Sequence, residues 1–224
     1  MVQKVVAIVQ ARVGSKRLPG KVLKTIEGKP LIEILFHRLS RSKAINTIIL
    51  ATSEHPENDV LATTVEIMGY DVFRGSEDDV LDRYYHAAKK YRSDIIVRIT
   101  GDCPIIDPKV VDDVVECFIN NDVDYASNVE PPTYPDGLDV EAFSFSALEH
   151  AHANATSIFD REHVTPFIRD RGNFKKINFT YSTNVSKERW TVDTAQDFEV
   201  VQNICRHFSP NLDFNLEDVL SLRE

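Results

Sequence analysis

The sequence has few cysteines and no long hydrophobic run. Its three cysteines, Cys103, Cys117 and Cys205, show neither Cys-x-x-Cys nor Cys/His metal-site spacing, and their odd number and wide separation argue against a disulfide framework. The longest apolar stretches, such as VVAIV and TIILAT, are far too short to cross a bilayer, and the N-terminus lacks the layout of a signal peptide. We therefore expect a cytoplasmic protein with reduced cysteines and no membrane association.

Two common nucleotide-binding motifs are also missing. A P-loop requires the spacing G-x-x-x-x-G-K-[ST], whereas here five residues separate Gly14 from Gly20, and Lys21 is followed by Val22. The Rossmann pattern G-x-G-x-x-G is absent as well. These absences exclude the two commonest nucleotide-binding folds.

Positive charge is scarce except in one segment. The chain has a net charge of -9 and a pI near 5.3, a balance that disfavours nucleic-acid binding. Residues 10–21, QARVGSKRLPGK, nevertheless contain Arg12, Lys16, Arg17 and Lys21 and no acid. Because this segment follows a hydrophobic run, it predicts a local anion-binding loop, with a solvated basic turn as the alternative.

Short β-branched runs alternate with helical patterns over the first part of the chain. We expect strands at 4–10, 47–53, 71–75, 94–100 and 123–128. Helices are expected after Pro30, Pro56 and Pro108, and the apolar stripe Leu81, Tyr84, Ala88 and Tyr91 predicts another. The alternation predicts an α/β fold with a mostly parallel sheet, helices on both faces and ligands at the carboxyl ends of the strands.

The pattern becomes irregular after residue 128. A Pro-rich loop feeding a strand is expected over 130–143, a helix start or loop over 161–168, and a further strand over 177–184. No linker, repeat or low-complexity segment interrupts the 224 residues, of which 42% are hydrophobic. We therefore predict a single domain over 1–224.

Five segments, in this order and spacing, closely resemble one enzyme family. They are QARxGSxRLPGKVL, EGKPLIEILFHRL, FRGSEDDVLDRYYHAA, VRITGDCPIIDP and WTVDTAQDFE. This pattern resembles the cytidylyltransferases of the spore-coat polysaccharide biosynthesis protein F family, relatives of the enzymes that make CMP-sialic acid and CMP-KDO. The resemblance implies a mixed-sheet nucleotidyltransferase fold related to GT-A glycosyltransferases. It also implies transfer of CMP from CTP to a sugar acid or sugar-like acceptor, with release of pyrophosphate, for cell-surface polysaccharide synthesis.

The resemblance assigns the basic segment to the triphosphate of CTP. Arg12, Ser15, Arg17 and Lys21 match the triphosphate-binding residues, with Arg12 and Lys21 in catalytic roles, while Lys16 faces solvent. Gly14 would allow the backbone to approach the phosphates, and Gln10 and Ala11 would offer backbone groups to the base.

The same resemblance predicts a magnesium site. Asp102 follows the strand at 94–100, and Asp193 would come from a late strand that meets it. Asp102 is therefore a predicted catalytic residue and metal ligand, and Asp193 a second ligand. The alternatives are a turn residue for Asp102 and a helix N-cap for Asp193.

Two further groups are expected around the nucleoside and the acceptor. By the resemblance, Gly75, Ser76, Asp79 and Arg83 approach the cytosine and ribose, although Ser76 could simply cap a helix and Asp79 could pair with Arg83. The residues expected to face the acceptor are Arg98, Tyr134, Asp136, Asp139, Glu141, Arg161 and His163. Asp139 and Glu141 would share one side of a strand, where they could receive sugar hydroxyls or simply form the exposed face of an edge strand. No general base is assigned, since His163 could equally be structural.

Two other functions remain open from the sequence. A GT-A glycosyltransferase would hold its metal with Asp-x-Asp, but Asp122 and Asp124 precede their strand instead of following it. A non-catalytic nucleotide-binding domain would be expected to have lost Lys21 or Asp102. A homodimer is possible because Phe198, Phe208 and Phe214 could serve an interface, with the core as the default.

Overall fold

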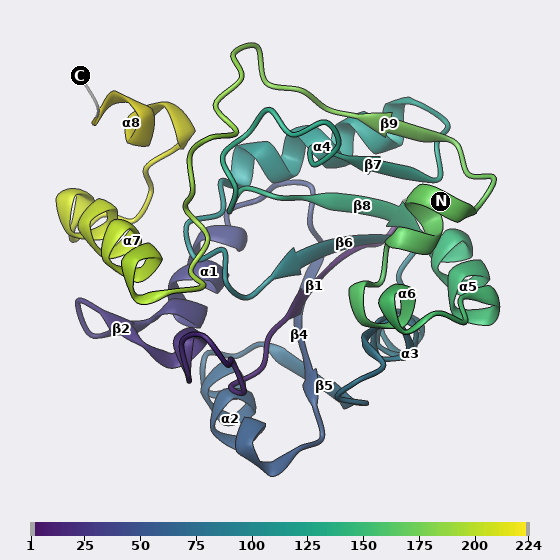
Figure 1. Cartoon of the computed structure of the whole chain (residues 1–224), viewed down its shortest axis with the longest axis horizontal. Helices are drawn as coiled ribbons and strands as arrows, with labels where there is room; N and C mark the ends of the chain where they lie inside the picture. The colour runs from purple at the N-terminus through teal and green to yellow at the C-terminus, as the bar shows by residue number, and fades with distance from the viewer. Residues whose placement is uncertain (1–2, 223–224) are drawn as a thin grey trace.

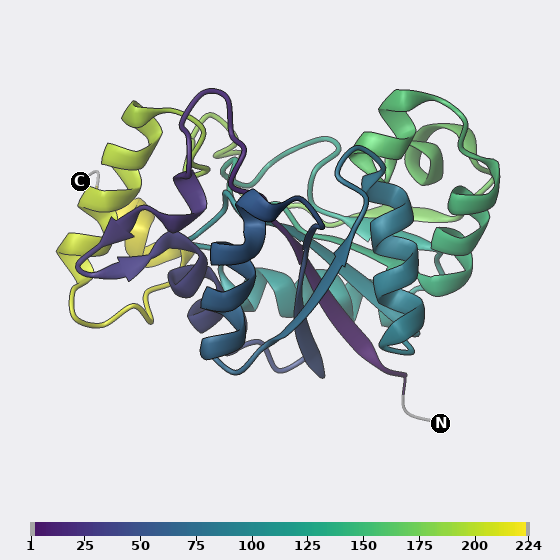
Figure 2. The same ribbon diagram turned by 90° about the horizontal axis from the view of Figure 1, so that it is seen from below.

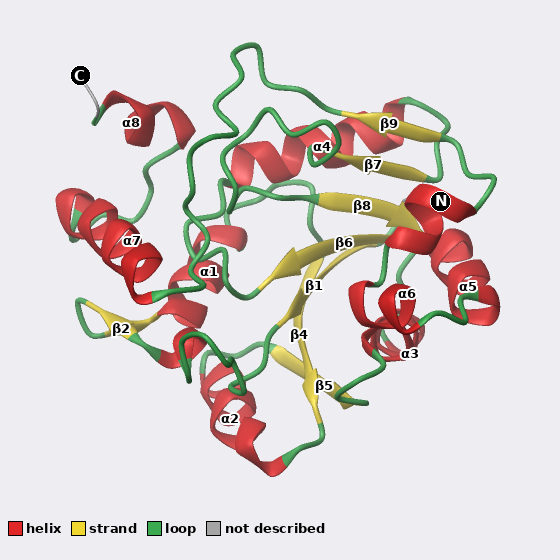
Figure 3. Cartoon of the chain, viewed as in Figure 1, coloured by secondary structure: helices red, strands yellow, loops and turns green. Residues whose placement is uncertain are grey.

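A computed structural model describes residues 3–222 and contains one large sheet at its centre (Figure 1). The sheet has seven strands in the order β5-β4-β1-β6-β8-β7-β9 (Figure 3). Their bounds are β1 Val5–Gln10, β4 Thr47–Ser53, β5 Asp71–Gly75, β6 Ile95–Thr100, β7 Tyr125–Ser127, β8 Glu141–Ser144 and β9 Lys176–Asn178. The strand β8 is antiparallel to β6 and β7, whereas the other neighbours are parallel. The predicted mixed, mostly parallel sheet is therefore confirmed.

The central strand β1 shows why the sheet is buried on both faces. Its side chains alternate between two hydrophobic clusters, with Val5, Ala7 and Val9 in one and Val6 and Ile8 in the other. All five are almost completely shielded from solvent. A run of β-branched residues without polar interruption is typical of a strand covered on both sides.

Helices cover both faces of the sheet, as the sequence predicts (Figure 2). One cluster receives side chains from α1 Leu31–Leu39, α2 Asp59–Ile67, α4 Pro108–Asn120, α7 Ala195–Phe208 and α8 Leu216–Ser221. The other receives them from α3 Val80–Lys90 and α5 Phe145–Asn154, and α6 Ile158–His163 packs against α3. The smaller elements are the hairpin β2 Thr25–Ile26 and β3 Lys29–Pro30, the single turns η1 Lys21–Leu23 and η2 Pro56–Asn58, and the π-helical turn η3 Phe167–Arg171.

A buried arginine on α1 fixes the C-terminal part of the chain. The Arg38 guanidinium donates to the carbonyls of Ile106, Leu212 and Phe214, and it lies 4.1 Å from the centre of the Phe214 ring. Phe214 is 5% exposed, and Phe198 and Phe208 pack against the same cluster. The aromatic tail therefore closes the core, while the homodimer stays a prediction.

Two expectations for the second half of the chain need correction. The strand expected over 177–184 is only Lys176–Asn178, because its one pairing partner, β7, is itself limited to Tyr125–Ser127. No strand within the described residues contains Asp193.

Over residues 3–222, no helix is long and apolar enough to cross a membrane. The cytoplasmic location stays a prediction.

Candidate active site

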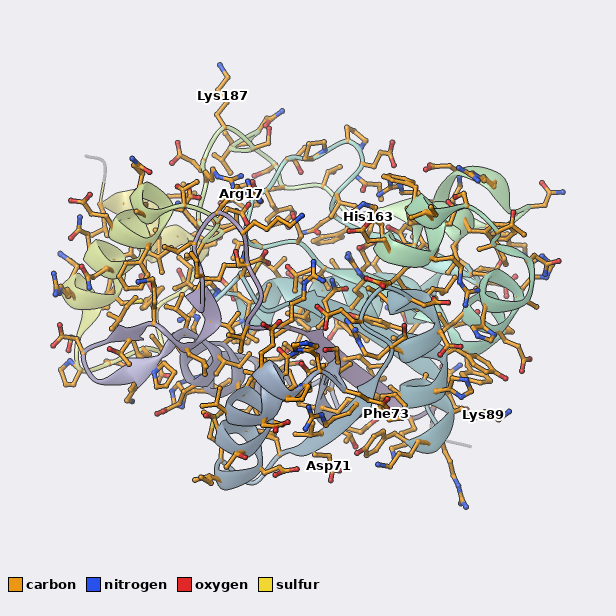
Figure 4. The ribbon with its side chains drawn as sticks, turned by 60° about the horizontal axis from the view of Figure 1, so that its bottom comes forward. Arg17, Asp71, Phe73, Lys89, His163 and Lys187 are labelled. Carbon is orange, nitrogen blue, oxygen red and sulfur yellow. The ribbon has the colours of Figure 1, made fainter. Side chains whose placement is uncertain are left out.

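The predicted site residues gather at one edge of the sheet, where β1, β4 and β6 end. Parallel strands present their carboxyl ends at the same edge, so the loops that follow these strands meet there. Arg17 and His163 lie on the same side of the molecule in Figure 4, away from Asp71 at the start of β5. The site is therefore built from loops after neighbouring strands.

The basic loop after β1 is held by its own backbone. Val13 anchors it, because its N–H donates to Asn58 Oδ1 at 2.8 Å and its carbonyl accepts from Ser15 and Gly20 at 2.7 and 3.1 Å. Gly20 has a φ of 65°, a left-handed conformation that favours glycine, and it leads directly into η1. This turn directs Lys21 inward, where it is 9% exposed, whereas Lys16 is exposed as predicted.

Lys21 lies between the two aspartates that the sequence predicts as metal ligands. Its Nζ is 2.9 Å from Asp102 Oδ2 and 2.9 Å from Asp193 Oδ1. Two carboxylates from distant parts of the chain thus converge on one cation. The structure therefore brings Asp102 and Asp193 together.

Backbone hydrogen bonds, and not a strand, bring Asp193 to this position. Val192 N–H donates to the Asp102 carbonyl at 2.7 Å, and the Thr191 hydroxyl donates to the same carbonyl at 3.2 Å. Thr194, which follows Asp193, is the N-cap of α7 and forms a capping box with Asp197. Asp193 is therefore not the N-cap, and its carboxylate is available to the site.

The charges in this group stabilise one another. Burial alone would lower the pKa of Lys21, but the charge of Asp102 and the hydrogen bonds to both aspartates raise it above the ordinary value. Burial alone would raise the pKa of Asp193, but Lys21 and Arg17, the latter 2.9 Å away, lower it. Arg189 Nη2 adds a third cation at 2.8 Å from Asp193. Lys21 and Asp193 are therefore both charged near neutral pH.

A second set of residues joins the ends of β1 and β4 to the loop after β5. Arg12 Nη1 lies 3.4 Å from Glu77 Oε1, and the Ser53 hydroxyl donates to Glu77 Oε2 at 2.7 Å. Glu77 therefore connects the predicted triphosphate residue Arg12 to the body of the protein. Arg12 is half-exposed and is free to turn toward a ligand.

Asp79 and Arg161 bind each other instead of lining an open site. Asp79 caps α3 by accepting from Asp82 N–H at 2.9 Å, and both of its oxygens accept from Arg161 Nε at 2.9 and 3.0 Å. The alternative surface pair between Asp79 and Arg83 does not form, because buried Arg83 donates to the Ser76 carbonyl. Ser76 is not the helix cap but accepts the Asp79 N–H at 3.1 Å. The Cβ of any other residue at Gly75 would lie 3.3 Å from Arg83 Cγ, so this turn is closely packed.

Arg98 and Glu141 form a buried ion pair beside a pocket of about 220 Å³. Glu141 Oε2 also accepts the Tyr125 hydroxyl at 2.6 Å, while Arg98 Nε donates to Gln10 Oε1 at 3.1 Å. Burial would raise the pKa of Glu141, but Arg98 and the hydrogen bonds to Thr165 and Tyr125 lower it. The pocket is lined by Arg98, Glu141, Phe159, His163, Thr165, Pro166 and Arg169.

Tyr134, Asp136 and Asp139, which are expected near the acceptor, do not line the pocket beside Arg98. Asp139 precedes β8 instead of lying on it, so it does not share a strand face with Glu141. Asp136 pairs with Arg189, which also binds Asp193, so it lies beside the two predicted metal ligands instead of in the pocket. Tyr134 is buried in the core, where its ring lies 5.2 Å from Tyr181, so it does not face the pocket.

Several residues of this site carry no recognisable signal in the sequence. Glu77, Ser53, Arg189 and Arg169 reach the site only through contacts between distant segments. Gly101 is also required, because a Cβ there would lie 2.6 Å from Ala11 Cβ. Its N–H donates to the Gln10 carbonyl at 2.8 Å, and this hydrogen bond joins the ends of β1 and β6 beside Asp102.

A cationic loop that faces two carboxylates suits an enzyme that handles a phosphorylated ligand together with a divalent cation. The model of the cytidylyltransferase family matches residues 6–214 and so identifies the class of enzyme. The chain therefore belongs to the cytidylyltransferase family and is a nucleotidyltransferase.

Individual relatives cover almost the whole chain. An uncharacterised protein of Methanocaldococcus jannaschii is 41% identical over 92% of this chain and 84% of its own length. Spore coat polysaccharide biosynthesis protein SpsF of Bacillus subtilis is 30% identical over 96% of this chain and 92% of its own. The solved structure of a cytidylyltransferase from Leptospira borgpetersenii has a TM-score of 0.94 and 33% identity, covering 99% of this chain and 94% of that one.

Two structures of lower identity share the fold and were solved with ligands. A CMP-2-keto-3-deoxy-manno-octonic acid synthetase in complex with CTP has a TM-score of 0.70 and 20% identity, over 92% of this chain and 99% of its own. Rv0371c of Mycobacterium tuberculosis in complex with manganese has a TM-score of 0.59 and 15% identity, over 90% of this chain and 99% of its own.

Proposed function

We propose that this cytidylyltransferase transfers CMP from CTP to a sugar acid or a related sugar acceptor, releases pyrophosphate, and serves the synthesis of a cell-surface polysaccharide. The observation that carries the proposal is the position of Lys21 between Asp102 and Asp193, beside a loop that contains Arg12 and Arg17. The name of SpsF and the CTP complex of the synthetase with the same fold support the acceptor class and the nucleotide.

The basic loop would bind the triphosphate. Arg17 and Lys21 are now paired with Asp193, and Arg12 with Glu77, so each can exchange a carboxylate for a phosphate oxygen when CTP enters. Lys21 is the deepest of the three and would lie closest to the α-phosphate, where charge develops during transfer. Ser15 and the exposed backbone at Gly14 would complete the loop.

Asp102 and Asp193 would hold a divalent cation, for which we propose Mg²⁺. The fit rests on their converging carboxylates, since oxygen ligands from one or two acids suit Mg²⁺. When bound, the cation would neutralise phosphate charge and favour departure of pyrophosphate. The two aspartates would fix the position of the cation, and Lys21 would contribute a protein cation to the phosphate oxygens beside them.

The pocket beside Arg98 would receive the acceptor. Glu141 is buried and fully engaged by Arg98 and Tyr125, so its role is to orient Arg98 and, through it, the Gln10 side chain. Arg98 and Arg169 would provide positive charge for the carboxylate of a sugar acid, and His163 stands at the exposed rim. No residue in this pocket is needed as a general base if the cation increases the acidity of the acceptor hydroxyl.

The Asp-x-Asp sequence does not support a glycosyltransferase. Asp122 is fully exposed and pairs with Lys175 at 2.6 Å, and Asp124 accepts from the Lys175 N–H at 2.9 Å. Both acids precede β7 and lie at its amino end, away from the edge where Lys21 meets Asp102.

Substitution of Asp102 tests the proposed function. Asp102→Asn keeps the shape of the side chain but removes its charge, so it should fold normally and lose turnover by orders of magnitude. The assay measures pyrophosphate release with each nucleoside triphosphate, Mg²⁺ and a panel of sugar acids and sugar phosphates. Asp122→Asn is the matched control and should remain fully active. Near-wild-type turnover of Asp102→Asn would remove this residue from the mechanism, and faster turnover with ATP or GTP would contradict the preference for CTP.

A further inference from the structure

Two histidines and one aspartate meet on the outer face of α3 and α5. Asp82 and His86 are one turn apart on α3, and His152 comes from α5. Asp82 Oδ1 lies 2.8 Å from His152 Nε2 and 3.4 Å from His86 Nε2. No residue of the proposed active site belongs to this group. Lys89, one turn further along α3, points away from Arg17 and His163 in Figure 4.

We propose that Asp82, His86 and His152 form a site for a transition-metal ion, with Zn²⁺ as the preferred ion. The three possible ligand atoms all lie within 4.8 Å of one another. Metal–ligand bonds of about 2.0–2.2 Å in tetrahedral geometry place neighbouring ligand atoms roughly 3.3–3.6 Å apart. The separation of Asp82 Oδ1 from His86 Nε2, 3.4 Å, lies in this range, and that from His152 Nε2, 2.8 Å, is shorter, so rotations of the side chains would admit an ion.

The neighbouring side chains hold His152 in place. The ring of Tyr85 stacks on the imidazole of His152, with centres 4.1 Å apart and planes at 11°, and meets His86 edge-on. The Tyr85 hydroxyl donates to Glu149 Oε1 at 3.3 Å and accepts from Lys89 Nζ at 3.2 Å. The Lys89 ammonium therefore binds the Tyr85 hydroxyl and lies over the Tyr85 ring. A ligand whose ring is fixed in advance loses little freedom when it binds an ion.

The donor set distinguishes this site from the active site. Two imidazole nitrogens and one carboxylate suit Zn²⁺ and similar ions, whereas Mg²⁺ prefers oxygen ligands such as Asp102 and Asp193. Three protein ligands leave a position for water. The side chains of Asp82, His86 and His152 are 34%, 52% and 24% exposed, so an ion can enter from solvent.

An ion at this site would tie α3 to α5. Arg161 already connects the same region, because it binds Asp79 at the start of α3 and donates to the His152 carbonyl at 2.8 Å. The metal would add a second connection one turn further along α3 and would stabilise the helical layer behind β5 and the loop at Ser76. The role we infer is structural, and it does not rest on the proposed function.

A second cluster of possible ligands must be separated from this one by experiment. His55, Glu57 and Glu77 also lie within reach of one another, but they offer one imidazole, and His55 and Glu57 are exposed. His55→Ala therefore provides a matched control, since it removes one histidine from the other cluster.

The test uses the full-length protein after treatment with a chelator. Zn²⁺ binding is measured by calorimetry, and Co²⁺ binding by the visible absorption that reports nitrogen ligands in tetrahedral geometry. We expect one equivalent of Zn²⁺ per chain at this site and a rise in melting temperature. His86→Ala and His152→Gln should each weaken binding by more than about 100-fold and abolish the rise, because each removes a direct ligand. His55→Ala should retain both.

The outcomes separate this site from both alternatives. His86→Ala removes a half-exposed side chain, so it is expected to fold even if His152→Gln does not, and metal-free melting curves check this. Turnover with CTP and Mg²⁺ should be unchanged in His86→Ala. The proposal is overturned if the wild-type protein binds no Zn²⁺, or if His55→Ala loses binding while His86→Ala keeps it.

Discussion

At the scale of single residues, the central feature is that Lys21 forms ion pairs with two carboxylates at once. A buried lysine is stable only when it is paired, and here Asp102 and Asp193 supply the compensation. The same ammonium would turn to phosphate oxygens when CTP and its cation arrive. Under the proposed function, the same charge would therefore contribute both to the folded structure and to nucleotide binding.

Removal of Lys21 should therefore affect nucleotide binding strongly. We expect Lys21→Ala to weaken CTP binding at least tenfold, about 1.4 kcal/mol, because the loop loses its buried cation and leaves two facing carboxylates uncompensated. Isothermal titration calorimetry measures the change. Lys16→Ala is the matched control in the same loop, since Lys16 is exposed, and it should bind CTP as the wild type does. If Lys21→Ala binds CTP as tightly as the wild type and Lys16→Ala do, the assignment of this loop to the phosphates is wrong.

Asp139 gives a prediction about pH. Burial, with the charges of Asp136 and Glu141, raises its pKa from 3.8 to about 7. The unfolded chain loses this proton near pH 4, whereas the folded protein keeps it up to about pH 7. The folded state therefore binds more protons in this window, and the free energy of unfolding contributed by Asp139 falls as pH rises from about 4 to about 7.

Replacement of Asp139 by asparagine removes this titration. In metal-free buffer at pH 8, Asp139→Asn should raise the free energy of unfolding by about 1–3 kcal/mol, since an amide has no charge to bury. The advantage should shrink as the pH is lowered below 7. Urea denaturation at pH 8 and pH 5.5 measures it, and an advantage that does not depend on pH would show that the carboxyl is not held protonated.

At the scale of elements, the contact between α3 and α6 depends on Asp79. This carboxylate caps α3 and also binds Arg161 of α6, so two structural tasks fall on a residue that the sequence assigned to nucleotide binding. The two tasks can be separated, because asparagine caps helices about as well as aspartate but carries no charge.

We expect Asp79→Asn to lose only the ion pair and Asp79→Ala to lose the cap as well. The asparagine variant should lower the free energy of unfolding by about 0.5–1 kcal/mol, and the alanine variant by about 1 kcal/mol more. Denaturant unfolding measures both values. CTP affinity should stay unchanged, because both oxygens of Asp79 are engaged by Arg161. A large loss of CTP affinity without loss of stability would instead support a direct contact with the nucleotide.

The elements also show what the sequence can predict. The strands β1, β4, β5 and β6 lie within a residue of their predicted bounds, because each pairs with a parallel neighbour and all but β5 are rich in β-branched residues. Asp102 could be placed at the edge of the sheet for the same reason. Asp193 could be paired with Asp102 only through family resemblance, since the bonds from Thr191 and Val192 to Asp102 span about ninety residues of chain. Strand β9 and the Asp79–Arg161 pair depend on similar long-range contacts.

At the scale of the whole molecule, one sheet separates two hydrophobic clusters that share its strands. The side chains of β1 alternate between the two clusters, so each cluster covers one face of the same strand. Disrupting either cluster would therefore also destabilise the other. Strand β9, the last strand of the described residues, pairs with β7 at the edge of that sheet. This arrangement supports the prediction of a single domain, whose four terminal residues lie outside the described range.

A single domain of this kind should unfold in one cooperative transition. Leu35 on α1 and Leu148 on α5 are fully buried in opposite clusters, and replacing either by alanine should lower the free energy of unfolding by about 2–5 kcal/mol. Both variants should shift the same transition to lower temperature in differential scanning calorimetry, with a van't Hoff enthalpy equal to the calorimetric enthalpy. Two separable transitions, each sensitive to only one of the variants, would mean that the two faces of the sheet fold as independent units, and the single-domain description would then be wrong.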